Sequence, residues 1–144
     1  MLLTIAMALP AYASEALVIT SQSLYADRKA NSAVFEGTVV ARSGDMALSA
    51  ERMVASYEEG GSLRTLVAEG SVKLVKGLQV LTSDKAVYDL FSRSMVFTGE
   101  PRAVDEGNVL MGDTISYYLD EDRIKVEKST MFIDNSGAAG AYNE

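Results

Sequence analysis

Short runs in which apolar and polar residues alternate recur along the chain. Residues 123–127 (RIKVE) alternate strictly, and residues 71–74 (SVKL) follow the same rule. A period of two places successive side chains on opposite faces of a β-strand. Val, Ile, Tyr, Phe and Thr, which favour strands, are frequent, and turn sequences such as EGGS at 59–62 separate the runs. The pattern therefore predicts an all-β protein.

The chain also repeats itself at a period of about 30 residues, which is typical of stacked supersecondary units. Residues 20–37 align with residues 82–99 without a gap, and seven of the 18 positions are identical. Such repetition predicts a stack of similar units, each of which buries its apolar face against its neighbours.

Glycines mark the repeat. One set closes an apolar run at Gly37, Gly70 and Gly99, and a second set follows seven or eight residues later at 44, 77 and 107. We predict that a long sheet bends at these glycines in every layer, because glycine supplies the dihedral angles that a bulge or corner requires. The alternative interpretation is that they are ordinary hairpin glycines.

One segment, residues 47–60 (ALSAERMVASYEEG), has an ambiguous pattern. Four apolar residues have helical spacing, namely Ala50, Met53, Val54 and Tyr57. The equivalent segments of the repeat, residues 82–90 (TSDKAVYDL) and 112–119 (GDTISYYL), have the pattern of strands. We therefore predict a strand here as well, because the repeat outweighs the local helix propensity.

The composition limits the classes of function. With 144 residues, of which 48% are hydrophobic and 23% charged, the chain is long enough for one globular domain. The formal net charge of −7 argues against nucleic-acid binding, which requires clustered Lys and Arg, and against electrostatic docking on anionic lipid surfaces.

Few groups are available for catalysis. The chain has no Cys and no His, which excludes a thiol nucleophile, a disulfide framework, a typical zinc site and a Ser-His-Asp triad. Asp84 and Asp113 could be taken for paired catalytic carboxylates, but together with Glu51 they occupy equivalent positions of the repeat. A structural role at corners explains them better. We predict no catalytic residue, no metal, no cofactor and no enzymatic activity.

Both ends of the chain differ from the domain between them. Residues 1–13 are apolar and end in small residues at Ala11 and Ala13, which is typical of a secretory signal peptide cleaved before Ser14. No Lys or Arg precedes the apolar run, so either the true start lies upstream or this segment is a buried first strand. We assign the domain to residues 14–132 and predict a disordered tail at 133–144, which is small and polar.

The ordered succession of these features resembles a known family. Residues 35–57 (FEGTVVARSGDMALSAERMVASY) and 86–129 (AVYDLFSRSMVFTGEPRAVDEGNVLMGDTISYYLDEDRIKVEKS) resemble the periplasmic lipopolysaccharide-transport family LptA, also called OstA-like. Its pattern is a V-F-T-G strand, a polar corner with glycine, an Ala-Asp or Gly-Asp pair and a strand that contains Tyr. The resemblance covers about residues 17–130.

The resemblance implies a repetitive antiparallel β-jellyroll, folded into a V-shaped trough that is open at both ends. It implies a periplasmic, non-enzymatic protein that binds lipopolysaccharide, shields its lipid A acyl chains and bridges the inner and outer membranes. Bridging would occur by head-to-tail stacking with other copies and with the jellyroll domains of LptC-like and LptD-like partners. Each buried methylene is worth about 0.8 kcal/mol, so an apolar trough can hold acyl chains while sugars and phosphates stay in water.

The resemblance also implies which side chains line the groove. Leu17 and Ile19 match the strand near the N-terminal opening, although both could be ordinary core residues. The other matching positions lie on strands whose inward side chains would meet the lipid: Val72, Leu74, Tyr88, Leu90, Tyr117 and Leu119. For Phe35 and Phe97, packing near a corner is the favoured interpretation.

Three alternatives remain open. The chain could be an LptC-like or LptD-like jellyroll module of the same pathway, or a polymerising β-scaffold that binds no ligand. A carbohydrate-active β-helix enzyme would need acidic and aromatic residues on one exposed face, and Trp is absent.

Overall fold

The computed structural model describes residues 16–134, which form strands and turns without a helix. The predicted signal peptide at 1–13 and nearly all of the predicted tail lie outside the described residues. The strands are β1 (Val18–Thr20), β2 (Ser23–Asp27), β3 (Ser32–Ser43), β4 (Met46–Tyr57), β5 (Leu63–Lys76), β6 (Gln79–Asp89), β7 (Ser94–Thr98), β8 (Arg102–Asp105), β9 (Asn108–Met111), β10 (Thr114–Tyr118), β11 (Arg123–Glu127) and β12 (Thr130–Phe132).

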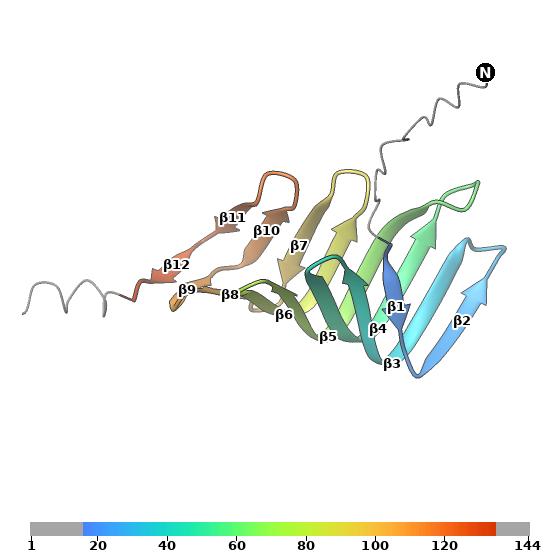
Figure 1. Cartoon of the computed structure of the whole chain (residues 1–144), viewed down its shortest axis with the longest axis horizontal. Helices are drawn as coiled ribbons and strands as arrows, with labels where there is room; N and C mark the ends of the chain where they lie inside the picture. Colours follow the sequence, from blue (N-terminus) through green and yellow to red (C-terminus); the bar gives the residue numbers. More distant parts are fainter. Residues whose placement is uncertain (1–15, 135–144) are drawn as a thin grey trace, which may run out of the picture.

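All strand pairs are antiparallel, and the pairing divides the folded sheet into two arms. The first arm contains β2, β7, β10 and β11 together with the parts of β3 to β6 that lie between them. The second arm contains β1, β8, β9 and β12 together with the remaining parts of β3 to β6. The strands lie side by side along the long axis of the molecule, from β2 at one end to β11 and β12 at the other (Figure 1).

The two arms meet at a line of corners. The register of the long strands shifts between Glu36 and Val39 in β3 and between Glu69 and Val72 in β5. At these points, and again after β7, a glycine with φ near +80° precedes a second residue of positive φ: Gly37–Thr38, Gly70–Ser71 and Gly99–Glu100. The prediction that these glycines form corners is confirmed. The second set, at 44, 77 and 107, lies in the hairpin turns instead.

Side chains of the neighbouring layer pack against the corner glycines. Glu51 lies against Gly70, and Asp84 lies against Gly99, with the Asp84 amide donating a hydrogen bond of 3.0 Å to the Gly99 carbonyl. Asp113 lies at the next corner, where its amide donates to the Glu127 carbonyl at 3.0 Å. The three acidic residues that repeat in the sequence are therefore all found at corners.

Residues 46–57 form a strand, as the repeat predicted. β4 pairs with β3 on one side and β5 on the other, and its side chains alternate between the buried interior and the surface. Leu48, Met53 and Ala55 point inward and are at most 2% exposed. Tertiary pairing on both edges overrides the helical spacing of this segment.

The sheet is not closed. Among the described residues, β2 and β1 pair only with β3 at one end, while β11 and β12 each have a single partner at the other end. Both ends therefore present unpaired strand edges. Residues 16–134 contain no helix with the length and apolarity that a membrane crossing requires.

Candidate functional site

The inner faces of the two arms form one apolar core. A row of inward side chains crosses the first arm from β2 to β11, each residue opposite the next: Ala26, Ala33, Ala55, Leu66, Tyr88, Met95, Tyr117 and Ile124. The row begins with three alanines at the β2 end and continues with larger side chains. The interior therefore has room at the β2 end and is filled farther along, where Leu66, Met95 and Tyr117 are completely buried.

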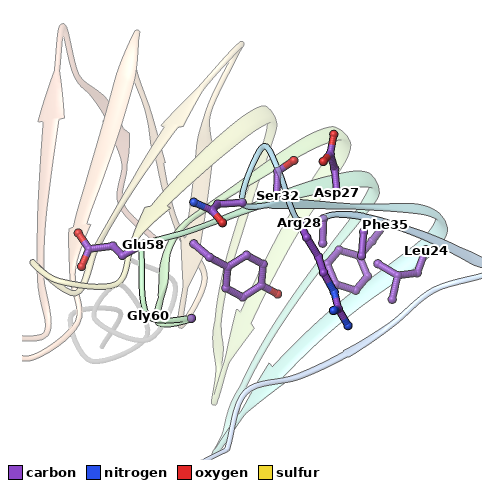
Figure 2. Close-up of a pocket in the computed structure, with 12 residues that line it drawn as sticks. Leu24, Asp27, Arg28, Ser32, Phe35, Glu58 and Gly60 are labelled. Atoms are coloured by element: carbon purple, nitrogen blue, oxygen red, sulfur yellow. The ribbon is translucent and has the colours of Figure 1, made fainter.

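A cavity of about 390 Å³ lies at the β2 end, beside the small residues (Figure 2). Its apolar wall includes Leu24, Ala33, Phe35 and Tyr57. Figure 2 shows Leu24, Phe35 and Arg28 on one side of the cavity and Glu58 and Gly60 on the other. Leu24 points inward, opposite Phe35, and is nevertheless 56% exposed, so this end of the interior opens to solvent.

A second cavity of about 400 Å³ adjoins the first, because Phe35 and Tyr57 line both. Four other residues complete its lining. Leu17 and Ile19 lie just before and within β1, and Leu63 and Leu90 lie at the outer end of the first arm. All six side chains that line it are apolar or aromatic. We refer to the two cavities together as the β2-end cavities; each has a volume within the range of small-molecule sites.

The eight residues predicted to line the groove all face the interior, but they do not share one cavity. Leu17, Ile19 and Leu90 line the second β2-end cavity. Tyr88 and Leu119 line a smaller, polar cavity of about 130 Å³ between the tips of the two arms. The remaining three are fully buried in the packed core, with exposures of 0 to 1%: Val72, Leu74 and Tyr117.

Sequence reasoning missed the aromatic pair that joins the two cavities. The sequence predicts only corner packing for Phe35, and it places Tyr57 only in the ambiguous segment 47–60. The feature of the sequence that points to the cavities is the set of three inward alanines, Ala26, Ala33 and Ala55. Small residues at facing positions leave space between the arms. Their facing arrangement depends on strand register, which the sequence alone did not give.

Away from the β2 end, a polar contact connects the two arms across the interior. Lys76, at the tip of β5 in the second arm, donates a hydrogen bond of 3.1 Å to the hydroxyl of Tyr117 in the first arm. That hydroxyl donates at 2.6 Å to Asp122 in the turn between β10 and β11. The Lys76 ammonium also lies 5.5 Å from the centre of the Tyr117 ring. We call Lys76, Tyr117 and Asp122 the arm clasp, because the bond between Lys76 and Tyr117 joins the two arms.

The arm clasp shifts the ionisation of its members. The hydrogen bond with Tyr117 raises the pKa of Lys76, with help from Asp122 and against the effect of burial. Burial raises the pKa of Tyr117, and its hydrogen bond to Asp122 adds to the shift. Burial also raises the pKa of Tyr88. In each case the form present at neutral pH is favoured. Among residues 16–134, no group of acidic side chains is arranged to hold a metal ion.

The sequence model of the LptA/(LptD N-terminal domain) LPS transport protein family matches residues 18–123. The match spans most of the chain, so the protein belongs to this family, as the resemblance predicted. No curated protein sequence is significantly similar to the chain.

The fold is similar to that of a solved structure. This is the crystal structure of LptH, described as the LptA homologous periplasmic component of the conserved lipopolysaccharide transport device from Pseudomonas aeruginosa. The TM-score is 0.76 at 16% sequence identity, and the match covers 83% of this chain and 96% of that chain. The likeness confirms the predicted all-β fold, an antiparallel jellyroll folded into an open-ended trough.

Proposed function

We propose that the protein is a periplasmic lipopolysaccharide-binding transfer protein that shelters acyl chains between its two arms. The observation that carries the proposal is the pair of adjoining apolar cavities at the β2 end, joined at Phe35 and Tyr57. Membership of a lipopolysaccharide-transport family supports the cargo. The chain acts in this account by binding and release, without catalysis.

The energetics favour acyl chains over other ligands. Each methylene removed from water contributes about 0.8 kcal/mol, and the lining supplies apolar contacts without requiring any charge. The second cavity is lined by five apolar side chains and Tyr57, so a sugar placed there would find few side-chain groups to replace its hydrogen bonds with water. The saccharide of the cargo accordingly stays outside the trough.

The filled part of the interior gives the transfer a direction. Acyl chains enter at the β2 end, where space exists, and advance toward β10 and β11 only as the arms separate. The arm clasp is the connection that separation must break. Breaking the clasp costs little, because each of its hydrogen bonds contributes only about 1 kcal/mol to stability and the freed groups can bond to water instead.

Bridging the two membranes would use the unpaired edges. Within residues 16–134, β1 and β2 at one end and β11 and β12 at the other each have a strand partner on one side only. Strand addition at such edges joins one jellyroll to the next and continues the trough from domain to domain. The partners are further copies of this chain and the jellyroll domains of LptC-like and LptD-like proteins.

A second candidate is a jellyroll module that works only as the LptD-like or LptC-like part of the same pathway. It is favoured by the matching family model, which includes the LptD N-terminal domain as well as LptA. A scaffold that polymerises without ligand would not need the β2-end cavities.

A photo-crosslinking amino acid tests the proposal. Placed at Phe35, which lines both cavities, it should capture lipopolysaccharide in cells of a Gram-negative host. The matched control is Tyr25, which lies on the same strand pair but is 67% exposed and points to the outer face. A probe at the fully buried Leu74 should give a weaker adduct than Phe35. Equal labelling at Phe35 and Tyr25, or filaments without any lipid adduct, would contradict the proposal.

A further inference from the structure

Three charged residues line the first of the β2-end cavities, the one beside the three alanines. Asp27 is the last residue of β2, Arg28 lies in the turn that joins β2 to β3, and Glu58 follows β4. A cation beside an apolar cavity is notable in a chain whose formal net charge is −7. The contacts of the three side chains decide which charge remains for a ligand.

Both carboxylates are already engaged. Asp27 Oδ1 accepts hydrogen bonds from the backbone amides of Lys29 at 2.9 Å and Ala30 at 3.1 Å, so it caps its own turn. Glu58 Oε1 forms an ion pair of 2.9 Å with Arg64 Nη1. Neither acid contacts the guanidinium of Arg28.

Arg28 has no such partner. Within the part of the chain that the structure describes, its side chain forms no ion pair and no hydrogen bond to another side chain. Arg52, Arg64, Arg93 and Arg123 each have a carboxylate within 4 Å. Arg28 is therefore a cation at the cavity whose charge is not neutralised by a contact with the protein.

An uncharged donor lies beside it. Asn31 lines the same cavity, and its side-chain amide is able to donate hydrogen bonds. The backbone of Asn31 is fixed by a hydrogen bond of 2.8 Å that its carbonyl accepts from the Tyr57 amide. This contact ties the turn that carries Arg28 to the end of β4.

We infer that Arg28, with Asn31, binds a phosphate of the lipid head group while an acyl chain of the same molecule lies against Leu24, Phe35 and Tyr57. The inference rests on the proposed function and deepens it: the cargo is recognised as a phosphorylated lipid, and not only by its acyl chains. A guanidinium matches a phosphate because its parallel N–H groups donate to two oxygens at once. The inference differs from the expectation that the phosphates stay wholly in water.

The structure offers a matched pair of variants. Arg28→Gln and Lys29→Gln remove the same charge from neighbouring exposed positions of one turn, but only Arg28 lines the cavity. Arg28→Lys keeps the charge and loses the bidentate geometry. Urea unfolding midpoints equal to wild type would establish that all three variants remain folded.

The experiment measures equilibrium binding of the full chain to lipid A that carries both phosphates, one phosphate or none. Wild type should bind the doubly phosphorylated form best. Arg28→Gln should weaken that binding about tenfold, since charge-assisted hydrogen bonds are lost. It should leave binding of dephosphorylated lipid A unchanged, and Lys29→Gln should match wild type. Millimolar inorganic phosphate should not displace the lipid, because free phosphate makes none of the apolar contacts that the acyl chains make.

The contrary outcomes are distinct. If wild type binds lipid A with and without phosphates equally, or if Arg28→Gln and Lys29→Gln weaken binding equally, the phosphate site is refuted and the acyl-binding function stands. If millimolar inorganic phosphate displaces bound lipid A, the site recognises free phosphate and the inference is wrong. If wild type binds none of the lipids, the proposed function fails and the inference fails with it.

Discussion

The corner at Gly70 allows a quantitative test of how the two arms are joined. Gly70 has φ of +82°, in a region that L-residues with a side chain rarely adopt. A Cβ built on it would lie 2.4 Å from Oε2 and 3.0 Å from Cβ of Glu51 on the neighbouring strand. Gly70→Ala therefore imposes both backbone strain and a steric clash.

The two penalties can be estimated separately. Holding an alanine at positive φ costs about 1–2 kcal/mol. Overpacking against a neighbour costs typically about 1–3 kcal/mol, and the long Glu51 side chain can relieve part of it by turning away. We expect Gly70→Ala to lower the free energy of unfolding by about 2–4 kcal/mol.

The control is Gly61, which has φ of +90° but no heavy atom within 4 Å of an added Cβ. Gly61→Ala should show the backbone penalty alone, about 1–2 kcal/mol. Urea unfolding followed by far-UV circular dichroism gives both values by linear extrapolation. Adding Glu51→Ala to Gly70→Ala should restore part of the loss.

Equal destabilisation by Gly61→Ala and Gly70→Ala would mean that the close contact between Gly70 and Glu51 has no energetic effect, contrary to this prediction. The double variant sharpens the test. If Glu51→Ala and Gly70→Ala are strictly additive, the two residues are not coupled and the corner is not packed as described.

Three further predictions concern the interior. Tyr117→Phe removes the hydroxyl of the arm clasp and should cost about 1 kcal/mol in urea unfolding, whereas Lys125→Met on the outer face should be neutral. Because Lys76 and Tyr117 have pKa values raised above 10.5 and 10.0, their contribution is complete below pH 10.0 and is lost as the pH rises through the raised values. The unfolding midpoint should therefore fall in alkaline solution, and less so in Tyr117→Phe; an equal fall in both proteins would contradict the clasp. Ala33→Met narrows the first of the β2-end cavities and should reduce the lipopolysaccharide retained on purification, with Ala47→Met on the outer face as the control.

The strands and corners could be predicted because the repeat encodes them locally. Gly37, Gly70 and Gly99 follow equivalent apolar runs, and the same backbone geometry recurs at each. The repeat also decided correctly between helix and strand for residues 46–57, where propensity alone was ambiguous. Information that recurs along the chain can be read from one sequence without any knowledge of tertiary contacts.

The distribution of space inside the trough could not be predicted in this way. The repeat treats Tyr57, Tyr88 and Tyr117 as equivalent, yet Tyr57 lines the β2-end cavities and Tyr117 is fully buried. The difference depends on what lies across the interior from each ring. Lys76 reaches Tyr117 from the other arm, and no pattern in the sequence links two residues that far apart.

The most direct test of the account is native mass spectrometry of the protein purified from the periplasm of a Gram-negative host. We expect a species heavier than the polypeptide by one lipopolysaccharide molecule, and a smaller share of that species for Ala33→Met than for Ala47→Met. Protein that carries no glycolipid, under conditions in which a known lipopolysaccharide carrier retains its cargo, would contradict the claim that the β2-end cavities shelter acyl chains.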